Sequence, residues 1–132
     1  MKVIEDKGKL ISIIYRADDW PSGVNFITPK SLFVQVASMV LDKGKIIPSH
    51  IHKEYAREIV RTHEVIYVVQ GSVKVFLYTD EKTFLHSHLL EMGDMAVYAN
   101  GGHGYEILED DTRVIELKNG PYIDVATDKE KF

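Results

Sequence analysis

Two of the chain's six histidines, His50 and His52, lie two residues apart in the stretch KIIPSHIH. Side chains alternate across a strand, so both imidazoles point to the same face if this stretch is extended. Two neutral imidazoles on one face can share a divalent metal ion. The chain has no cysteine, so any metal must be held by nitrogen and oxygen ligands.

Glu64 and His103 are the candidates for the remaining ligands. Glu64 opens the apolar run EVIYVVQ, and His103 follows the turn formed by residues 100–102. If both of these strands line the same interior, a carboxylate and a third imidazole approach the first pair. Three nitrogens and one oxygen suit one divalent ion of iron, manganese, nickel, cobalt or zinc, with positions left for water or substrate.

The other histidines are weaker candidates. His63 adjoins Glu64. Neighbouring strand residues point to opposite faces, so His63 should point outward if Glu64 points inward. His63 could replace one of the ligands only if a loop at this position breaks the alternation. His86 and His88 have the same spacing as the first pair without similar flanking residues, and we interpret them as an exposed strand face.

Several side chains are candidates for binding a substrate. Arg57, together with Arg61, lies between the His-x-His pair and Glu64, where a guanidinium can pair with a carboxylate or phosphate or can simply be solvated. Tyr67 and Tyr105, with Tyr98, have an apolar ring and a polar tip that suit a cavity wall, although strand aromatics are more often packing residues.

Short segments rich in valine, isoleucine, phenylalanine and tyrosine, separated by glycine-containing turns, must position these residues. They predict strands over residues 9–15, 32–40, 45–52, 64–70, 72–79, 84–91, 95–98, 104–108 and 112–118. Residues 53–61 are the best helical candidate, and we interpret them as a loop or a single helical turn. The end of the chain, TDKEKF, reads as a polar tail.

The chain's 132 residues, 45% hydrophobic and 27% charged, fit one globular domain spanning residues 1–132. Many short strands in one such domain predict an all-β fold closed into a barrel or jelly roll, because closure removes exposed strand edges.

Two stretches resemble the two motifs of the cupin family. The first has Gly44, five residues, the pair His50 and His52, a spacer of eleven residues, Glu64, six residues and a glycine. This spacer is longer than the family usually has. The second has Gly93, the residues DMAVYANGG and His103, with alanine in place of a proline and one residue fewer before the histidine. Together the two motifs cover residues 44–103.

The resemblance implies a single-domain cupin jelly-roll β-barrel whose metal is held by His50, His52, Glu64 and His103. Residues 101–122, with DKEKF after them at residues 128–132, are also similar to small bacterial cupins of unsettled activity that are associated with polysaccharide biosynthesis. The resemblance suggests a homodimer too, and residues 1–31, with ISIIY and the FITP stretch near Trp20, are a possible dimer contact.

Three functions remain open. The first is a metal-dependent enzyme, an isomerase or dioxygenase, that acts on a small polar or sugar-like molecule. The second is a non-catalytic module that binds a small molecule. The third is a metal-free sugar-nucleotide isomerase or epimerase that uses a histidine as acid or base.

Charge and hydropathy limit the classes of partner that we expect for this protein. The net charge is -4 and the 16 basic residues are scattered, so no footprint for nucleic acid is present. No apolar run is long enough to cross a bilayer, and the N-terminal stretch lacks the pattern of a secretory signal. We therefore expect a cytoplasmic protein with a small-molecule ligand and without nucleic-acid or membrane partners.

Overall fold

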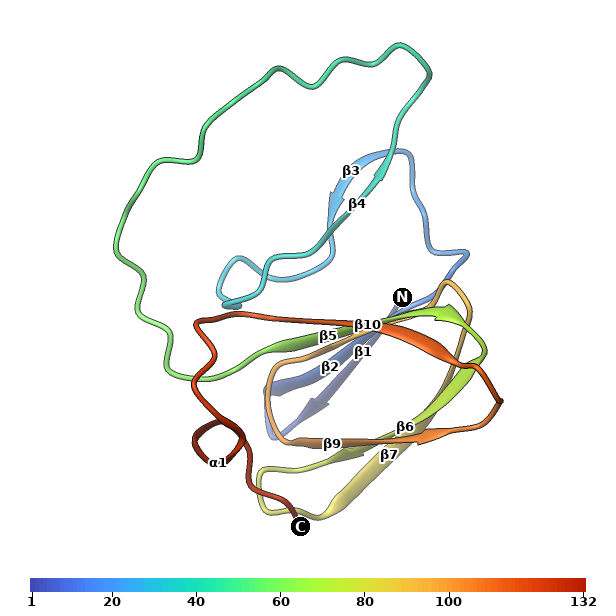
Figure 1. Cartoon of the computed structure of the whole chain (residues 1–132), viewed down its shortest axis with the longest axis vertical. Helices are drawn as coiled ribbons and strands as arrows, with labels where there is room; N and C mark the ends of the chain where they lie inside the picture. Colours follow the sequence, from blue (N-terminus) through green and yellow to red (C-terminus); the bar gives the residue numbers. More distant parts are fainter.

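Ten strands in antiparallel pairs make up nearly all of the regular structure in the computed structural model, which describes residues 1–132 (Figure 1). One four-residue helix follows them. The elements are β1 (Lys2–Asp6), β2 (Lys9–Tyr15), β3 (Gly23–Phe26), β4 (Ala37–Val40), β5 (Glu64–Gln70), β6 (Ser72–Tyr78), β7 (Phe84–Glu91), β8 (Met95–Tyr98), β9 (Gly102–Ile107), β10 (Arg113–Lys118) and α1 (Val125–Asp128).

Two sheets face each other and enclose the main core. The larger sheet has the order β1-β2-β8-β5-β10, and the smaller sheet has the order β7-β6-β9. Alternate residues of each strand point inward, as period-two patterning requires. The buried cluster between the sheets includes Ile14, Ile66, Val75, Leu77 and Leu90. This sandwich determines which side chains can meet in its interior.

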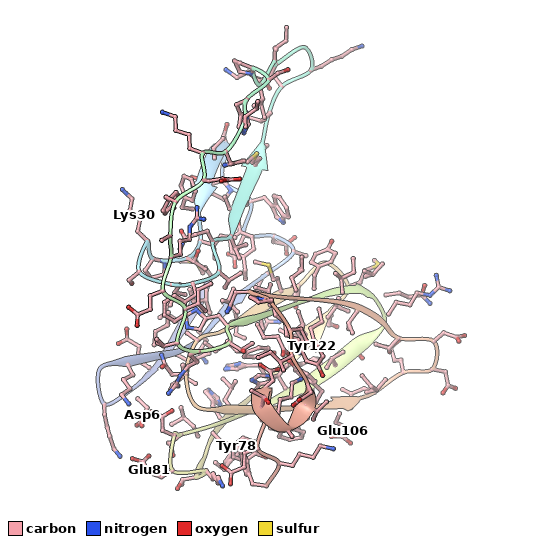
Figure 2. The ribbon with its side chains drawn as sticks, turned by 60° about the vertical axis from the view of Figure 1, so that its left-hand side comes forward. Asp6, Lys30, Tyr78, Glu81, Glu106 and Tyr122 are labelled. Atoms are coloured by element: carbon pink, nitrogen blue, oxygen red, sulfur yellow. The ribbon has the colours of Figure 1, made fainter.

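A third layer covers the outer face of the larger sheet. Ile13, Val65 and Val97 point away from the sandwich and pack against residues of the segment 27–36. This segment connects β3 and β4, which form a two-stranded sheet that we call the hairpin arm. In the turned view of Figure 2 the hairpin arm projects away from the sandwich.

Residues 41–63, which we call the long loop, contain no helix or strand. The predicted strand over residues 45–52 is therefore wrong, and residues 53–61 are a loop without a helical turn. In Figure 1 the long loop leaves the tip of β4 and arches outside the sandwich before it enters β5. Its only internal backbone hydrogen bond joins Lys45 N–H to Asp42 C=O at 3.1 Å.

Most of the other predicted strands are confirmed within two residues. They correspond to β2, β5, β6, β7, β8, β9 and β10, whereas the predicted strand over residues 32–40 shrinks to β4. The sequence patterns missed β1, β3 and the short helix α1, which lies in the predicted polar tail. Edge strands of four or five residues carry little periodic signal.

The all-β fold is confirmed, but none of the three sheets closes into a barrel. The apolar stretch ISIIY in β2 pairs with β1 on one side and β8 on the other, so it has no free edge for a partner. No helix of the structure has the length and apolar character needed to span a membrane.

Candidate active site

Glu64, His103 and Tyr105 meet inside one end of the sandwich. The Nε2 atom of His103 lies 3.2 Å from the Oε1 atom of Glu64, and the Tyr105 hydroxyl donates a 2.8 Å hydrogen bond to the same oxygen. Glu64 is only 3% exposed although it is the first residue of its strand. A buried carboxylate that accepts two such hydrogen bonds is the centre of a polar cluster in an otherwise apolar interior.

The strand pairing explains why these residues meet. Glu64 in β5 is opposite Tyr98 in β8, and both point inward with Ile66. His103 and Tyr105 in β9 are opposite Leu77 and Val75 of β6, whose side chains also point inward. Each pair brings side chains from one sheet toward the other, so the cluster is a product of the facing sheets.

A tight turn before β9 fixes the position of His103. Gly101 has a positive φ of 69°, and its N–H donates to Asp80 Oδ1 at 3.0 Å. The Asn100 side chain donates to the Leu10 carbonyl at 2.7 Å and accepts from Arg61 at 3.0 Å. These bonds attach the turn to three other segments of the chain.

The protonation states of the cluster follow from burial and hydrogen bonding. Burial raises the pKa of Glu64, but the hydrogen bonds from His103 and Tyr105 and nearby positive charge outweigh it and lower this pKa to about 2. Burial raises the pKa of the Tyr105 phenol well above its usual value. At neutral pH Glu64 is therefore a carboxylate and Tyr105 a neutral donor.

His103 is held in one tautomer by Glu64. An ionised carboxylate can only accept hydrogen bonds, so Nε2 of His103 carries the hydrogen that faces Glu64. In the neutral ring Nδ1 is then the basic nitrogen. The ring stacks on Tyr98 with centroids 4.1 Å apart and planes inclined by 14°. The Tyr98 hydroxyl is buried without a hydrogen-bond partner.

The cluster lines a cavity of about 500 Å³. Its other walls come from the turn before β9, the start of the loop after β6, and the C-terminal segment from Asp128 to Phe132. The charged groups on the wall are paired, with Lys82 on Glu130 at 2.7 Å and Arg61 on Asp80 at 3.4 Å. This volume lies in the range of small-molecule sites, and most of the residues that line the cavity are polar or charged.

Two lysines that the sequence analysis did not consider contact Glu64. The Nζ atoms of Lys118 and Lys129 lie 3.4 Å and 3.7 Å from its Oε2 atom. Lys118 is directly opposite Glu64 in the pairing of β10 with β5. Antiparallel alignment of the two apolar runs could have found this pair, whereas no local pattern marks Lys129 because it lies beyond the last strand.

His50 and His52 do not reach Glu64 and His103 in this structure. Both histidines are exposed on the long loop, with ring centroids 5.1 Å apart. No group of three or more histidine or acidic side chains is arranged to hold a metal ion. In this arrangement His50, His52, Glu64 and His103 therefore cannot bind one metal ion together. The ammonium groups of Lys118 and Lys129 lie beside the Glu64 carboxylate instead.

His63 points away from the cluster, as strand alternation predicts. It is 4% exposed, stacks on Phe33 with centroids 4.8 Å apart, and accepts a hydrogen bond from the Phe33 N–H at Nδ1. Burial lowers the pKa of His63, and the Arg61 charge lowers it further. His63 thus belongs to the packing between the sandwich and the segment before β4.

The remaining candidates lie outside the cavity that contains His103. Tyr67 is opposite Met95, on the outer face of β5, and Arg57 is exposed on the long loop with its guanidinium over the Tyr55 ring. His86 is exposed as predicted, but His88 is only 8% exposed because it is opposite Val75 on the core face. The interpretation of His88 as exposed is therefore wrong.

No protein-family model matches this chain, and no curated protein or solved structure matches it at a significant level.

Proposed function

We propose that this chain is an enzyme of cupin type that moves a proton within a small, sugar-like molecule, with His103 as the acid–base group. The observation that carries the proposal is the ion-paired cluster in which Glu64 binds the Nε2 side of His103 at 3.2 Å beside the cavity. Two facing antiparallel sheets and the order of the two motifs support the cupin assignment.

Each member of the cluster has a role in this reaction. Glu64 keeps His103 in one orientation and stabilises the imidazolium that forms when Nδ1 accepts a proton, as in other carboxylate–histidine pairs. The Tyr105 hydroxyl donates a second hydrogen bond to the Glu64 carboxylate and so limits the movement of this side chain. The Tyr98 ring stacks on the His103 imidazole and so helps to fix its plane.

The reaction requires no co-reactant. Nδ1 of His103 takes a proton from a carbon next to a carbonyl group, and the electron pair of that C–H bond moves toward the carbonyl oxygen. On Nδ1 the proton exchanges with solvent, and Nδ1 then returns a proton to the neighbouring carbon, as the hydroxyl proton shifts between the two oxygens, or to the other face of the same carbon. The product is an isomer or epimer, and no group is oxidised or lost.

Hydrogen exchange with solvent tests this proposal. The protein is incubated in D₂O with a panel of aldoses, ketoses and nucleotide-linked sugars, and loss of C–H signals is followed by NMR. We expect exchange in at least one substrate, reduced at least about 100-fold by His103→Gln, a typical contribution of one acid–base group. The control is His86→Gln, on an exposed strand position, which should exchange normally. Equal exchange in both variants would refute the role of His103.

A metal-dependent enzyme is the second candidate, favoured by the approach of Glu64 and His103, two of the four predicted ligands. Elemental analysis separates the candidates. The wild type is compared with a His50→Ala, His52→Ala variant and with His86→Ala, because His88 is buried and unsuitable as a control. If the wild type contains stoichiometric metal and only the His50→Ala, His52→Ala variant loses it, the metal-dependent enzyme would replace the metal-free proposal. Absence of metal from all three after reloading would support the metal-free one.

A further inference from the structure

One flank of the sandwich is open between β9 and β10. Tyr105 and Ile107 of β9 point inward, yet they are 39% and 56% exposed. Val114 of β10 is opposite the core residue Val68 and is 43% exposed. In contrast, their inward-pointing neighbours in β6, Val73 and Val75, are at most 1% exposed.

A missing strand explains this exposure. The larger sheet has five strands and the smaller sheet has three, so the larger sheet has strands without a counterpart in the smaller sheet. β9 pairs with β6 along one edge only. The Leu108 N–H bonds to the Ser72 carbonyl of β6, so by alternation the backbone groups of His103, Tyr105 and Ile107 point to the free edge. An unpaired edge beside exposed apolar side chains is a template for another strand.

Residues 49–52 match this free edge. They are exposed and make no backbone–backbone hydrogen bond, and Ile51 is 93% exposed. The added strand would begin after Pro48, because proline has no N–H for a ladder and is tolerated as the first residue of a strand.

An antiparallel register with His50 opposite His103 turns both histidines of the loop inward, toward Glu64. Ser49 then lies opposite Gly104, and Ile51 lies opposite Gly102, beside which the Phe132 ring packs. A Cβ at Gly104 would meet no atom within 4 Å, so a side chain can be introduced there on the outer face of β9.

The direction of the chain favours a second copy as the source of this strand. β4 belongs to the layer outside the larger sheet, whereas β9 belongs to the opposite sheet, so the two are separated by about 20 Å of stacked sheets. Residues 41–48 span about 28 Å at most when fully stretched. They would also have to reverse direction and pass round the sheet edge, because β4 leads away from the sandwich (Figure 1).

The hairpin arm gives a second reason. Its apolar side chains Phe26, Val24 and Met39 are 74%, 50% and 50% exposed, and they would stay exposed if the long loop folded back onto its own sandwich. Contact with a second copy can cover both the arm and the open flank. A patch this apolar is typical of an interaction surface.

We propose that two copies of this chain exchange their long loops, so that residues 49–52 of each copy pair with β9 of the other and place His50 and His52 beside Glu64 and His103 of that copy. The exchange completes the smaller sheet with a fourth strand. It is argued from strand edges and exposure, so it stands independently of the proton-transfer proposal, and it offers a route to the four-ligand set that one copy lacks.

Disulfide trapping tests the exchange. The chain has no cysteine of its own, so only the introduced cysteines can form a disulfide. The variant Ser49→Cys, Gly104→Cys joins positions that the proposed register places directly opposite, within the usual disulfide distance. We expect a covalent dimer on non-reducing electrophoresis, with a mixed-isotope cross-linked peptide when ¹⁴N- and ¹⁵N-labelled copies are combined. The control Ser49→Cys, Asp110→Cys places the second cysteine in the exposed turn after β9 and should remain monomeric on the same gel.

Each other result overturns the proposal. A disulfide within one chain would show that the loop docks on its own sandwich, and no disulfide would exclude the pairing. If the control variant also forms a covalent dimer, the disulfides arise from random collisions between chains and not from the proposed pairing. If Gly104→Cys does not fold, Ser49→Cys, Glu106→Cys treated with a short bismaleimide cross-linker tests the same register, since Glu106 is exposed on the outer face of β9 and is the diagonal neighbour of position 49 (Figure 2). The trap needs neither substrate nor metal, so failure of the proposed enzyme activity leaves its result unaffected.

Discussion

At the scale of single residues, burial and hydrogen bonding give identical residue types different properties. His103 borders a cavity and is held by Glu64, whereas His88 is buried against the core with its Nε2 atom unpartnered. Burial and nearby positive charge lower the pKa of His88 to about 4. The first histidine is the one that we propose as the acid–base group, and the second is a neutral packing residue.

We predict that replacing Tyr105 by phenylalanine weakens the cluster. The change removes the 2.8 Å hydrogen bond to the buried Glu64 carboxylate. A hydrogen bond to a charged group contributes about 1.5–3 kcal/mol, so the free energy of unfolding should fall by that order. Urea denaturation measures it. Tyr67→Phe, on the outer face of β5, is the matched control and should change little. Equal losses in both variants would contradict the role of the bond.

His88 should make stability depend on pH. Its folded pKa of about 4 lies below the value of 6.5 that is usual for a histidine, so the unfolded chain binds more protons between these two pH values. Its contribution is fully present above about pH 6.5 and falls by about 3 kcal/mol as the pH approaches 4. His88→Leu should flatten this slope in unfolding curves at pH 7, 6, 5 and 4. A slope unchanged from the wild type would indicate that His88 is charged in the folded state.

At the scale of elements, the turn between β8 and β9 decides where His103 lies. Gly101 has a positive φ, and a Cβ at this position would lie 2.1 Å from the Tyr78 carbonyl oxygen. Both partners in this contact belong to the backbone, so neither can move aside easily. The turn therefore requires glycine at position 101. The geometry of the candidate site thus depends on a residue that carries no functional group.

Gly101→Ala should therefore destabilise the protein more than Gly8→Ala. Both glycines have positive φ values, 69° and 76°, but nothing lies within 4 Å of a Cβ at Gly8. Gly8→Ala should cost about 1 kcal/mol from backbone strain alone. The steric clash at Gly101 should add at least about another 1 kcal/mol. Thermal unfolding compares them, and similar midpoints would mean that the turn relaxes freely.

At the scale of the whole molecule, one copy of the chain leaves its sandwich incomplete. The smaller sheet lacks a strand beside β9, and the long loop exposes an unpaired backbone. A two-stranded hairpin such as β3–β4 has little stability of its own in water. The proposed exchange would pair both the free edge of β9 and the long loop.

The exchange predicts that stability rises with protein concentration, because unfolding then includes dissociation of two copies. The melting temperature of the wild type should increase between micromolar and submillimolar protein. Phe26→Glu, Met39→Glu places charges on the exposed face of the hairpin arm and should shift the sedimenting species from dimer to monomer. Lys30→Glu, a change at an already exposed charged position, is the control. A wild-type melting temperature independent of concentration would argue against association.

Local patterns were sufficient for much of the fold and for part of the site. Alternating apolar residues predicted β2, β5, β6 and β7 closely, because each has seven or eight residues, enough to display a period of two. Glu64, His103 and Tyr105 were all singled out, and they do meet. The same reasoning failed for residues 45–52, since alternation indicates what a strand would bury but cannot indicate whether a neighbouring strand is available.

The sequence by itself determined the strand identity of most segments, the all-β class and which residue types could do chemistry. The reason is that periodicity and side-chain chemistry are local properties. Only the tertiary structure decided that Lys118 and Lys129 lie beside Glu64, that His88 is buried, and that the long loop remains apart from the sandwich. Those outcomes depend on which strands pair and which faces they cover, and pairing joins residues far apart in the chain.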